Sequence, residues 1–353
     1  MINSLLSTRF FMPLKNAHSH SPTKESTDHS FALKIAIALF VGVFGQAAFA
    51  TPAGAPQPAL RVTEISQTTH PFETLYCARQ PAQYRFLGDA LELVVNNESR
   101  ILMPAMAASG ARYVAPGDPT TEFWGKGALA NITWSDEALP VCAPAGTLIP
   151  PYKASGNEPF WSLAFDGWDA TLTQPGKAPL TQDAQISDTR TKGQTLAAGS
   201  GANMLKLTVE EALCVDTMSG MPYPQQAELQ YQSNTWQGCG GDPNRLLQGV
   251  TWRVAQLNGH EINAQTRPEI HFMPNNRIAG NTGCNRFFGE YALTGEGMQI
   301  KGLGSTRMAC SEKLMTQENT FLGQLKDVNG IAFDTVDTLI LNTPEGEIRA
   351  TAN

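Results

Sequence analysis

The sequence predicts a mainly β protein built from three small domains. Short segments that alternate apolar and polar residues recur along the chain between glycine, asparagine and aspartate breaks, as in Tyr84–Leu87, the Gly88-Asp89 turn and Leu91–Val95. A chain of 353 residues exceeds one small core, and its cysteines fall into three separate stretches. We therefore expect an antiparallel, β-barrel-like first domain over 62–146, a β-rich middle domain over 150–243, and a last domain over 246–353 with a β layer and one helix.

The cysteines support this division. Segments rich in proline and glycine, 143–151 and 240–243, separate the pairs Cys77–Cys142, Cys214–Cys239 and Cys284–Cys310, so these are the expected disulfides. Metal binding is the alternative. No pair has Cys-x-x-Cys spacing, and after residue 50 the only histidines are His70, His260 and His271. We expect neither a metal nor another cofactor.

Residues 1–50 have the features of a signal peptide. Lys34 precedes an apolar run, 35–44, that is too short to span a bilayer, and Ala48-Phe49-Ala50 provides a small-x-small cleavage site. Translation starts at Met1 or at Met12, and an uncleaved membrane anchor is the alternative interpretation. No cysteine lies near the cleavage point, so we expect no lipid attachment.

The mature chain is predicted to be periplasmic or secreted, with no integral membrane span after cleavage. Residues 51–61 are rich in proline and are expected to form a flexible leader. The formal net charge of −7 argues against nucleic acid as a partner and suits a basic protein partner.

Two segments between Cys77 and Cys142 are the most distinctive part of the first domain. In 109–113, Ser-Gly-Ala-Arg-Tyr places a hydroxyl beside a glycine, and in 123–127, Phe-Trp-Gly-Lys-Gly places a lysine among glycines and aromatic residues. With Tyr76 before the first cysteine, this pattern resembles the MliC/PliC family of bacterial inhibitors of C-type lysozyme. It departs from the family in Ala107, where a serine is frequent, and in a longer connection over 114–122.

The resemblance implies that Ser109 and Lys126 are the inhibitory pair, with Arg112 and Tyr113 as further lysozyme-binding candidates. Tyr113 and Trp124 also suit a supporting role, and Ser109 and Lys126 taken singly fit a turn residue and a surface charge. Lysozyme uses two carboxyl groups, one protonated and one ionised. An inserted ammonium favours the ionised form, and so removes the proton that the general acid must donate.

The middle region carries another pattern. The segment 156–161 reads Gly-Asn-Glu-Pro-Phe-Trp, and 214–219 reads Cys-Val-Asp-Thr-Met-Ser. These segments are similar to an uncharacterised family of bacterial envelope domains. This resemblance suggests no particular activity for the middle region. Asn157 and Glu158 precede a proline and are expected in a turn rather than in a ligand site. Residues 173–203, rich in Thr, Gln, Gly and Ala, are expected to form long loops.

The last region resembles the META domain, also called HslJ-like. The matching segments are Thr251-Trp252, 257–259, 280–289 and 305–310. The family implies a β layer with one helix, which we expect to begin after an N-cap at Ser311. Its apolar stripe is formed by Leu314, Phe321, Leu322 and Leu325.

A glycine-rich stretch of this region contains Asn281, Asn285 and Arg286. It lacks the Lys-Ser/Thr pair of a nucleotide-binding loop. We therefore expect a tight turn that holds Cys284 near Cys310, rather than a ligand site.

Catalytic sequence motifs are lacking. The sequence contains no Gly-x-Ser-x-Gly and no His-Glu-x-x-His, so we predict that it is not an enzyme. Carboxylate pairs that meet only in three dimensions leave a hydrolase as an alternative. The favoured function is inhibition of C-type lysozyme. The main alternative is a non-inhibitory envelope-stress or binding protein of the META type, in which the first domain keeps only its fold.

Overall fold

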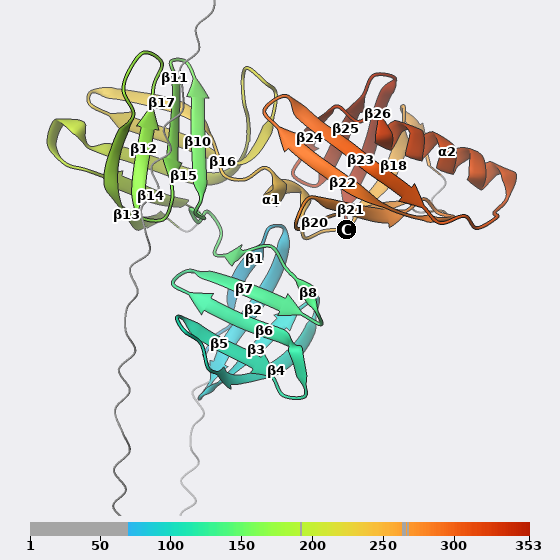
Figure 1. The fold of residues 1–353 in the computed structure, drawn as a ribbon, viewed down its shortest axis with the longest axis horizontal. Helices are drawn as coiled ribbons and strands as arrows, with labels where there is room; N and C mark the ends of the chain where they lie inside the picture. The colour runs from blue at the N-terminus through green and yellow to red at the C-terminus, as the bar shows by residue number, and fades with distance from the viewer. Residues whose placement is uncertain (1–69, 191–192, 263–265, 267) are drawn as a thin grey trace, which may run out of the picture. The chain divides into compact units, whose positions relative to one another are not determined.

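The computed structural model describes residues 70–190, 193–262, 266 and 268–353. The predicted signal peptide, the leader and residues 62–69 lie outside the described residues. Within them the protein is mainly β, with three antiparallel sheets and two α-helices (Figure 1). The expected fold class is therefore confirmed. No helix in this part of the chain is long and apolar enough to cross a bilayer.

The first sheet closes into a barrel because β6 pairs with β7 as well as with β5. Paired asparagines with positive φ, Asn96 and Asn97, make the tight turn between β3 and β4. The Cys77–Cys142 disulfide joins β1 to β9 inside the core. The strands are β1 (Glu73–Cys77), β2 (Gln80–Leu87), β3 (Ala90–Val95), β4 (Glu98–Ala105), β5 (Ala111–Ala115), β6 (Asp118–Lys126), β7 (Leu129–Trp134), β8 (Glu137–Ala138) and β9 (Cys142–Ala143).

The second sheet is a closed barrel in which β17 pairs back onto β10. Leu163, Leu196 and Leu207 are fully buried in its core, and Cys214–Cys239 is a disulfide. The strands are β10 (Tyr152–Asn157), β11 (Phe160–Phe165), β12 (Asp169–Thr173), β13 (Leu180–Arg190), β14 (Gly193–Ala198), β15 (Leu205–Val215), β16 (Pro222–Tyr231) and β17 (Asn234–Gly240), with a 3₁₀ turn at Gly201–Asn203.

The expectation of long loops over 173–203 is wrong, because β13 and β14 occupy most of this segment. Thr181, Asp183 and Gln185 of β13 are exposed, and the backbone groups of both strands pair with neighbouring strands, so composition alone misled the prediction. At Gly193 a side chain would not fit, since a Cβ there would lie 2.4 Å from the carbonyl oxygen of Val209 on β15.

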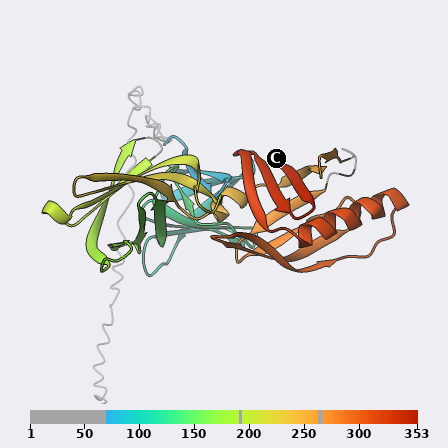
Figure 2. The same ribbon diagram turned by 90° about the horizontal axis from the view of Figure 1, so that it is seen from above.

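The third sheet is open, and helix α2 (Glu312–Lys326) runs along it in both views (Figures 1 and 2). Trp252, Phe287 and Leu339 form the core with buried residues of the helix. The other elements are α1 (Asn244–Leu247), β18 (Trp252–Leu257), β19 (His260–Glu261), β20 (Glu269–Met273), β21 (Arg277–Asn281), β22 (Arg286–Thr294), β23 (Gly297–Ser305), β24 (Gly330–Thr335), β25 (Thr338–Thr343) and β26 (Gly346–Ala352).

Helix α2 begins after Ser311, as the sequence predicts, although the Ser311 side chain makes no capping hydrogen bond. Of the expected stripe, Phe321 and Leu325 are fully buried, whereas Leu314 and Leu322 are half-buried. Glu318 is buried on the same side of the helix, which was not predicted from the sequence.

Candidate functional site

Ser109 and Lys126 lie at the same end of one antiparallel ladder. Ser109 belongs to the exposed connection between β4 and β5, residues 106–110, which we call the 106–110 loop. Lys126 is the exposed last residue of β6. The final registered pair of β5 and β6 is Ala111 opposite Gly125, so Gly110 and Lys126 are the next residues along the two chains. The fold thus brings together two residues that are distant in sequence.

Trp124 connects the loop to the strand that carries Lys126. Its indole Nε1 donates a hydrogen bond to the carbonyl oxygen of Ser109 at 2.8 Å. Trp124 pairs with Arg112 across the ladder, and its side chain is partly exposed. An indole in this position presents an apolar ring outward while its one polar atom is satisfied.

Gly110 completes the turn into β5. Its φ is +72°, a region that L-residues with a side chain rarely adopt. A Cβ at this position would lie 2.4 Å from the carbonyl oxygen of Gly125 and 3.2 Å from the Trp124 Nε1 atom. The Ser-Gly pair therefore has a structural cause, because only glycine allows the loop to approach β6 this closely.

The Arg112 side chain is bonded to groups of its own barrel. Its guanidinium forms a 2.7 Å salt bridge with Glu122 on β6, and this hydrogen bond raises the pKa of Arg112 above its ordinary value. A second, longer hydrogen bond of 3.4 Å reaches the carbonyl oxygen of Met106 at the start of the 106–110 loop. The Arg112 charge is thus paired with a carboxylate on its own surface.

Tyr113 lies on the other face of the same strand. It pairs with Phe123, and its ring packs near those of Phe86 and Phe123, with centroids 6.0 and 6.4 Å apart. The ring contacts the first barrel's core. Ser109 and Lys126 therefore share an outer surface, whereas the Tyr113 ring packs inward.

Lys126 differs from Arg112 in having an unengaged charge. Within the described part of the chain, its ammonium donates no hydrogen bond and forms no salt bridge. The long connection over 114–122 does not interfere with it. That connection folds into a hairpin turn at Pro116-Gly117, at the opposite end of β6 from Lys126. A cation and a hydroxyl-bearing loop are thus presented together on an accessible edge.

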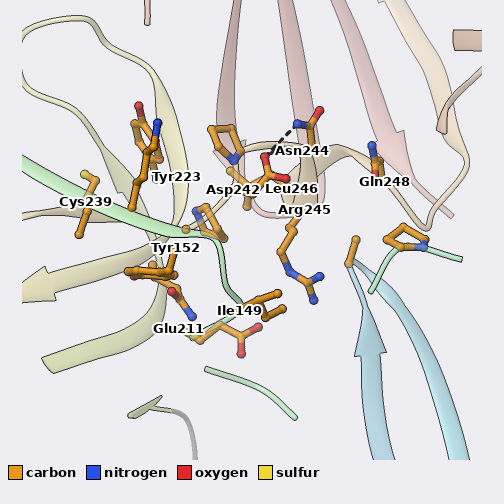
Figure 3. Close-up of a pocket in the computed structure, with 18 of the residues that line it drawn as sticks. Ile149, Tyr152, Glu211, Tyr223, Cys239, Asp242, Asn244, Arg245, Leu246 and Gln248 are labelled. Carbon is orange, nitrogen blue, oxygen red and sulfur yellow. Dashed lines mark hydrogen bonds between the residues drawn. The ribbon is translucent and has the colours of Figure 1, made fainter. Parts of the chain in front are cut away.

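A cavity of about 1260 Å³ is a second candidate site (Figure 3). The Arg245 guanidinium beside it donates to the carbonyl oxygens of Val141 and Tyr76 at 2.7 and 2.9 Å, and burial lowers the pKa of this arginine. The Asp242 carboxylate accepts hydrogen bonds from Asn244. Arg245 and Asp242 are thus bonded to the protein's own groups, within a wall that mixes polar and apolar side chains. No residue of this cavity was predicted from the sequence to bind a ligand or partner.

The glycine-rich stretch of the third sheet is an internal network. The Asn285 side-chain amide donates to Glu318 at 3.0 Å, and its oxygen accepts from the Thr306 hydroxyl and the Met308 amide at 2.8 and 2.7 Å. Cys284 and Cys310 form the adjacent disulfide. Asn285 is 1 % exposed, so this residue supports the fold and faces no ligand.

Within the described residues no group of three or more His, Cys, Asp or Glu side chains is arranged to hold a metal ion. The first barrel thus presents an anchored loop beside a lysine that has no bonded partner among the described residues.

Comparison with known families identifies two segments of the chain. Residues 76–139 match the family described as membrane-bound lysozyme-inhibitor of c-type lysozyme, MliC, and residues 245–352 match the META domain. The resemblances of the first and last regions are thereby confirmed, as a match to the MliC family and a match to the META domain, whereas the resemblance of the middle region stays a prediction. The MliC match includes Ser109 and Lys126.

One curated relative is the heat shock protein HslJ of Escherichia coli strain K12, 34% identical over 83 residues. The aligned segment is 23% of this chain and 59% of that relative's length. Among solved structures, the NMR structure of a protein from Burkholderia xenovorans matches 31% of this chain and 86% of that chain at 21% identity. Its TM-score is 0.27, too low to establish a shared fold.

Proposed function

We propose that this protein inhibits C-type lysozyme through its first barrel, by inserting Lys126 and Ser109 into the catalytic cleft. The observation that carries the proposal is the unpaired Lys126 ammonium beside the anchored 106–110 loop, inside the segment that matches the MliC family. Arg112 and Tyr113 lie on the neighbouring strand β5, and their observed contacts suit support better than insertion.

The chemistry follows from the target's two carboxyl groups. A general acid in lysozyme must carry a proton, and its partner must be ionised. The Lys126 ammonium would stabilise the ionised form of either group that it contacts. The Ser109 hydroxyl can donate to one carboxylate and accept from a protonated one. Occupation of the cleft would also exclude the polysaccharide.

Export of the chain to the periplasm or beyond is part of this proposal, because its target acts on peptidoglycan outside the cytoplasm. The three disulfides of the described residues support it, since such bonds persist in oxidising compartments. Both matched families are of inhibitor or binding type, which supports a function without catalysis.

A direct test is titration of the purified, oxidised protein into a lysis assay of bacterial cell walls by a C-type lysozyme. Lysis should slow as the protein is added, and the inhibition should reach its maximum once the added protein exceeds the lysozyme concentration. A folded, oxidised protein without effect would refute the proposal.

The second candidate is a non-inhibitory envelope-stress or binding protein. It is supported by the META domain, which spans more of the chain than the MliC match, and by the similarity to HslJ. Under this alternative, deletion of the gene would alter tolerance of heat or envelope stress in a strain never exposed to lysozyme. Lys126 would then be dispensable for that tolerance.

A further inference from the structure

The 106–110 loop must hold the Ser109 hydroxyl in place without help from regular secondary structure. A flexible loop that orders only on binding loses conformational entropy at that moment, which weakens the complex. A loop that is already held in its binding conformation avoids this cost. Side chains that hold the loop before lysozyme binds would therefore strengthen inhibition.

Trp124 is the first anchor. Its indole N–H bonds the Ser109 carbonyl oxygen at 2.8 Å, a normal length for a strong hydrogen bond of this type. The donor belongs to the residue two positions before Lys126 on the same strand. The bond therefore connects the main chain of one proposed inhibitory residue to the strand of the other.

Arg112 is the second anchor. The Glu122 salt bridge at 2.7 Å fixes the guanidinium, which also reaches the Met106 carbonyl oxygen at 3.4 Å. Met106 itself is 95% exposed, so its backbone is held while its side chain points into solvent. The first and fourth residues of the loop are thus bonded to side chains from one directly opposed pair, Arg112 and Trp124.

We propose that Trp124 and Arg112 are positioning residues that hold the 106–110 loop in its binding conformation in the free protein. Trp124 acts through Ser109, whose main chain it fixes beside Lys126. Arg112 acts on the start of the loop through Met106. This inference rests on the proposed inhibition of lysozyme, and it assigns these two residues a role other than direct contact with the enzyme.

The test is Trp124→Phe, which keeps an aromatic ring and removes the N–H donor. Loss of one hydrogen bond predicts inhibition weaker by roughly 2- to 10-fold. The change should appear as faster dissociation, with the association rate nearly constant. Trp168→Phe is the matched control, because Trp168 is a more exposed tryptophan on the second barrel, at 82%. It should leave inhibition unchanged.

A double-mutant cycle separates positioning from direct contact. In a Ser109→Ala background, Trp124→Phe should cost little further inhibition, because the hydroxyl that it positions is gone. Full additivity of the two substitutions would overturn the proposal, as would unchanged inhibition by Trp124→Phe alone.

A measurement without lysozyme keeps this inference separate from the proposed function. Backbone NMR relaxation of the free full-length protein should show greater motion at 107–110 in Trp124→Phe and in Arg112→Gln, with the barrel strands unaffected. If wild type fails to inhibit lysozyme, the proposed function falls. If loop motion is unchanged in both variants, the positioning role falls.

Discussion

The carbonyl oxygen of Gly125 lies 2.4 Å from the place where a Cβ on Gly110 would be. Two glycines from the separate motifs of the sequence thus meet at the end of the β5–β6 ladder, and the contact explains why position 110 is a glycine. The contact requires the 106–110 loop to pack directly against the main chain of β6.

Gly110→Ala should therefore both destabilise the first barrel and weaken inhibition. The substitution meets a positive φ and the Gly125 oxygen together, so we expect a loss of about 1–3 kcal/mol in unfolding free energy. Gly117→Ala is the control, because Gly117 has a φ of +78° and nothing within 4 Å of its virtual Cβ. Chemical denaturation of both variants measures the difference, and equal losses would contradict a steric role for the contact.

Lys126→Ala should weaken lysozyme inhibition and leave the melting temperature unchanged. Loss of a charge-assisted hydrogen bond predicts about 1.5–3 kcal/mol, roughly 10- to 150-fold in the inhibition constant. The fold should tolerate the change because Lys126 is exposed and has no bonded partner among the described residues. Lys301→Ala, at an exposed lysine of the META domain, is the control. Unimpaired inhibition by Lys126→Ala would refute the role of this lysine.

Asn285→Ala should destabilise the META domain without affecting lysozyme inhibition. The substitution removes the Asn285 amide group that donates to the buried Glu318 carboxylate. It also removes the Asn285 oxygen that accepts hydrogen bonds from the Thr306 hydroxyl and the Met308 amide. We expect a loss of about 1–3 kcal/mol, measured by calorimetry. Asn319→Ala, at an exposed position of α2, should be nearly neutral. If inhibition fell together with META stability, the two domains would not function independently.

We expect the ionised Asp118 carboxylate to stabilise the first barrel, and this stabilisation to be lost in acid. Hydrogen bonds from Thr120 and Thr121 hold the pKa of this carboxyl below its ordinary value of 3.8, with Arg100 contributing charge. Because the folded pKa is the lower one, the stabilisation is present above 3.8 and is lost as the pH falls through the folded value.

Thermal unfolding over a pH series tests this. Asp118→Asn should melt below wild type at neutral pH, and the two curves should converge in acid. Asp89→Asn, at an exposed turn, is the control and should melt close to wild type at neutral pH. A difference between wild type and Asp118→Asn that is constant across the pH series would contradict the assignment.

Local sequence patterns predicted much of the architecture. Alternating residues and turn residues predicted the β class, proline and glycine breaks predicted the three disulfide pairs, and the stripe through Phe321 and Leu325 predicted α2. These features depend on neighbours within a few positions, or on spacing along the chain. Strands β13 and β14 escaped prediction because their stability comes from pairing with β12 and β15 rather than from their own polar composition.

The sequence by itself determined the residue types of the proposed surface: a hydroxyl beside a glycine, and a lysine two residues after a tryptophan. Only the tertiary structure decided their partners. It bonded Trp124 to Ser109, paired Arg112 with Glu122, turned Tyr113 toward the core and left Lys126 unpaired among the described residues. The reason is strand register: it sets which side chains meet across β5 and β6 and which face each occupies, and it is fixed by the closed barrel as a whole.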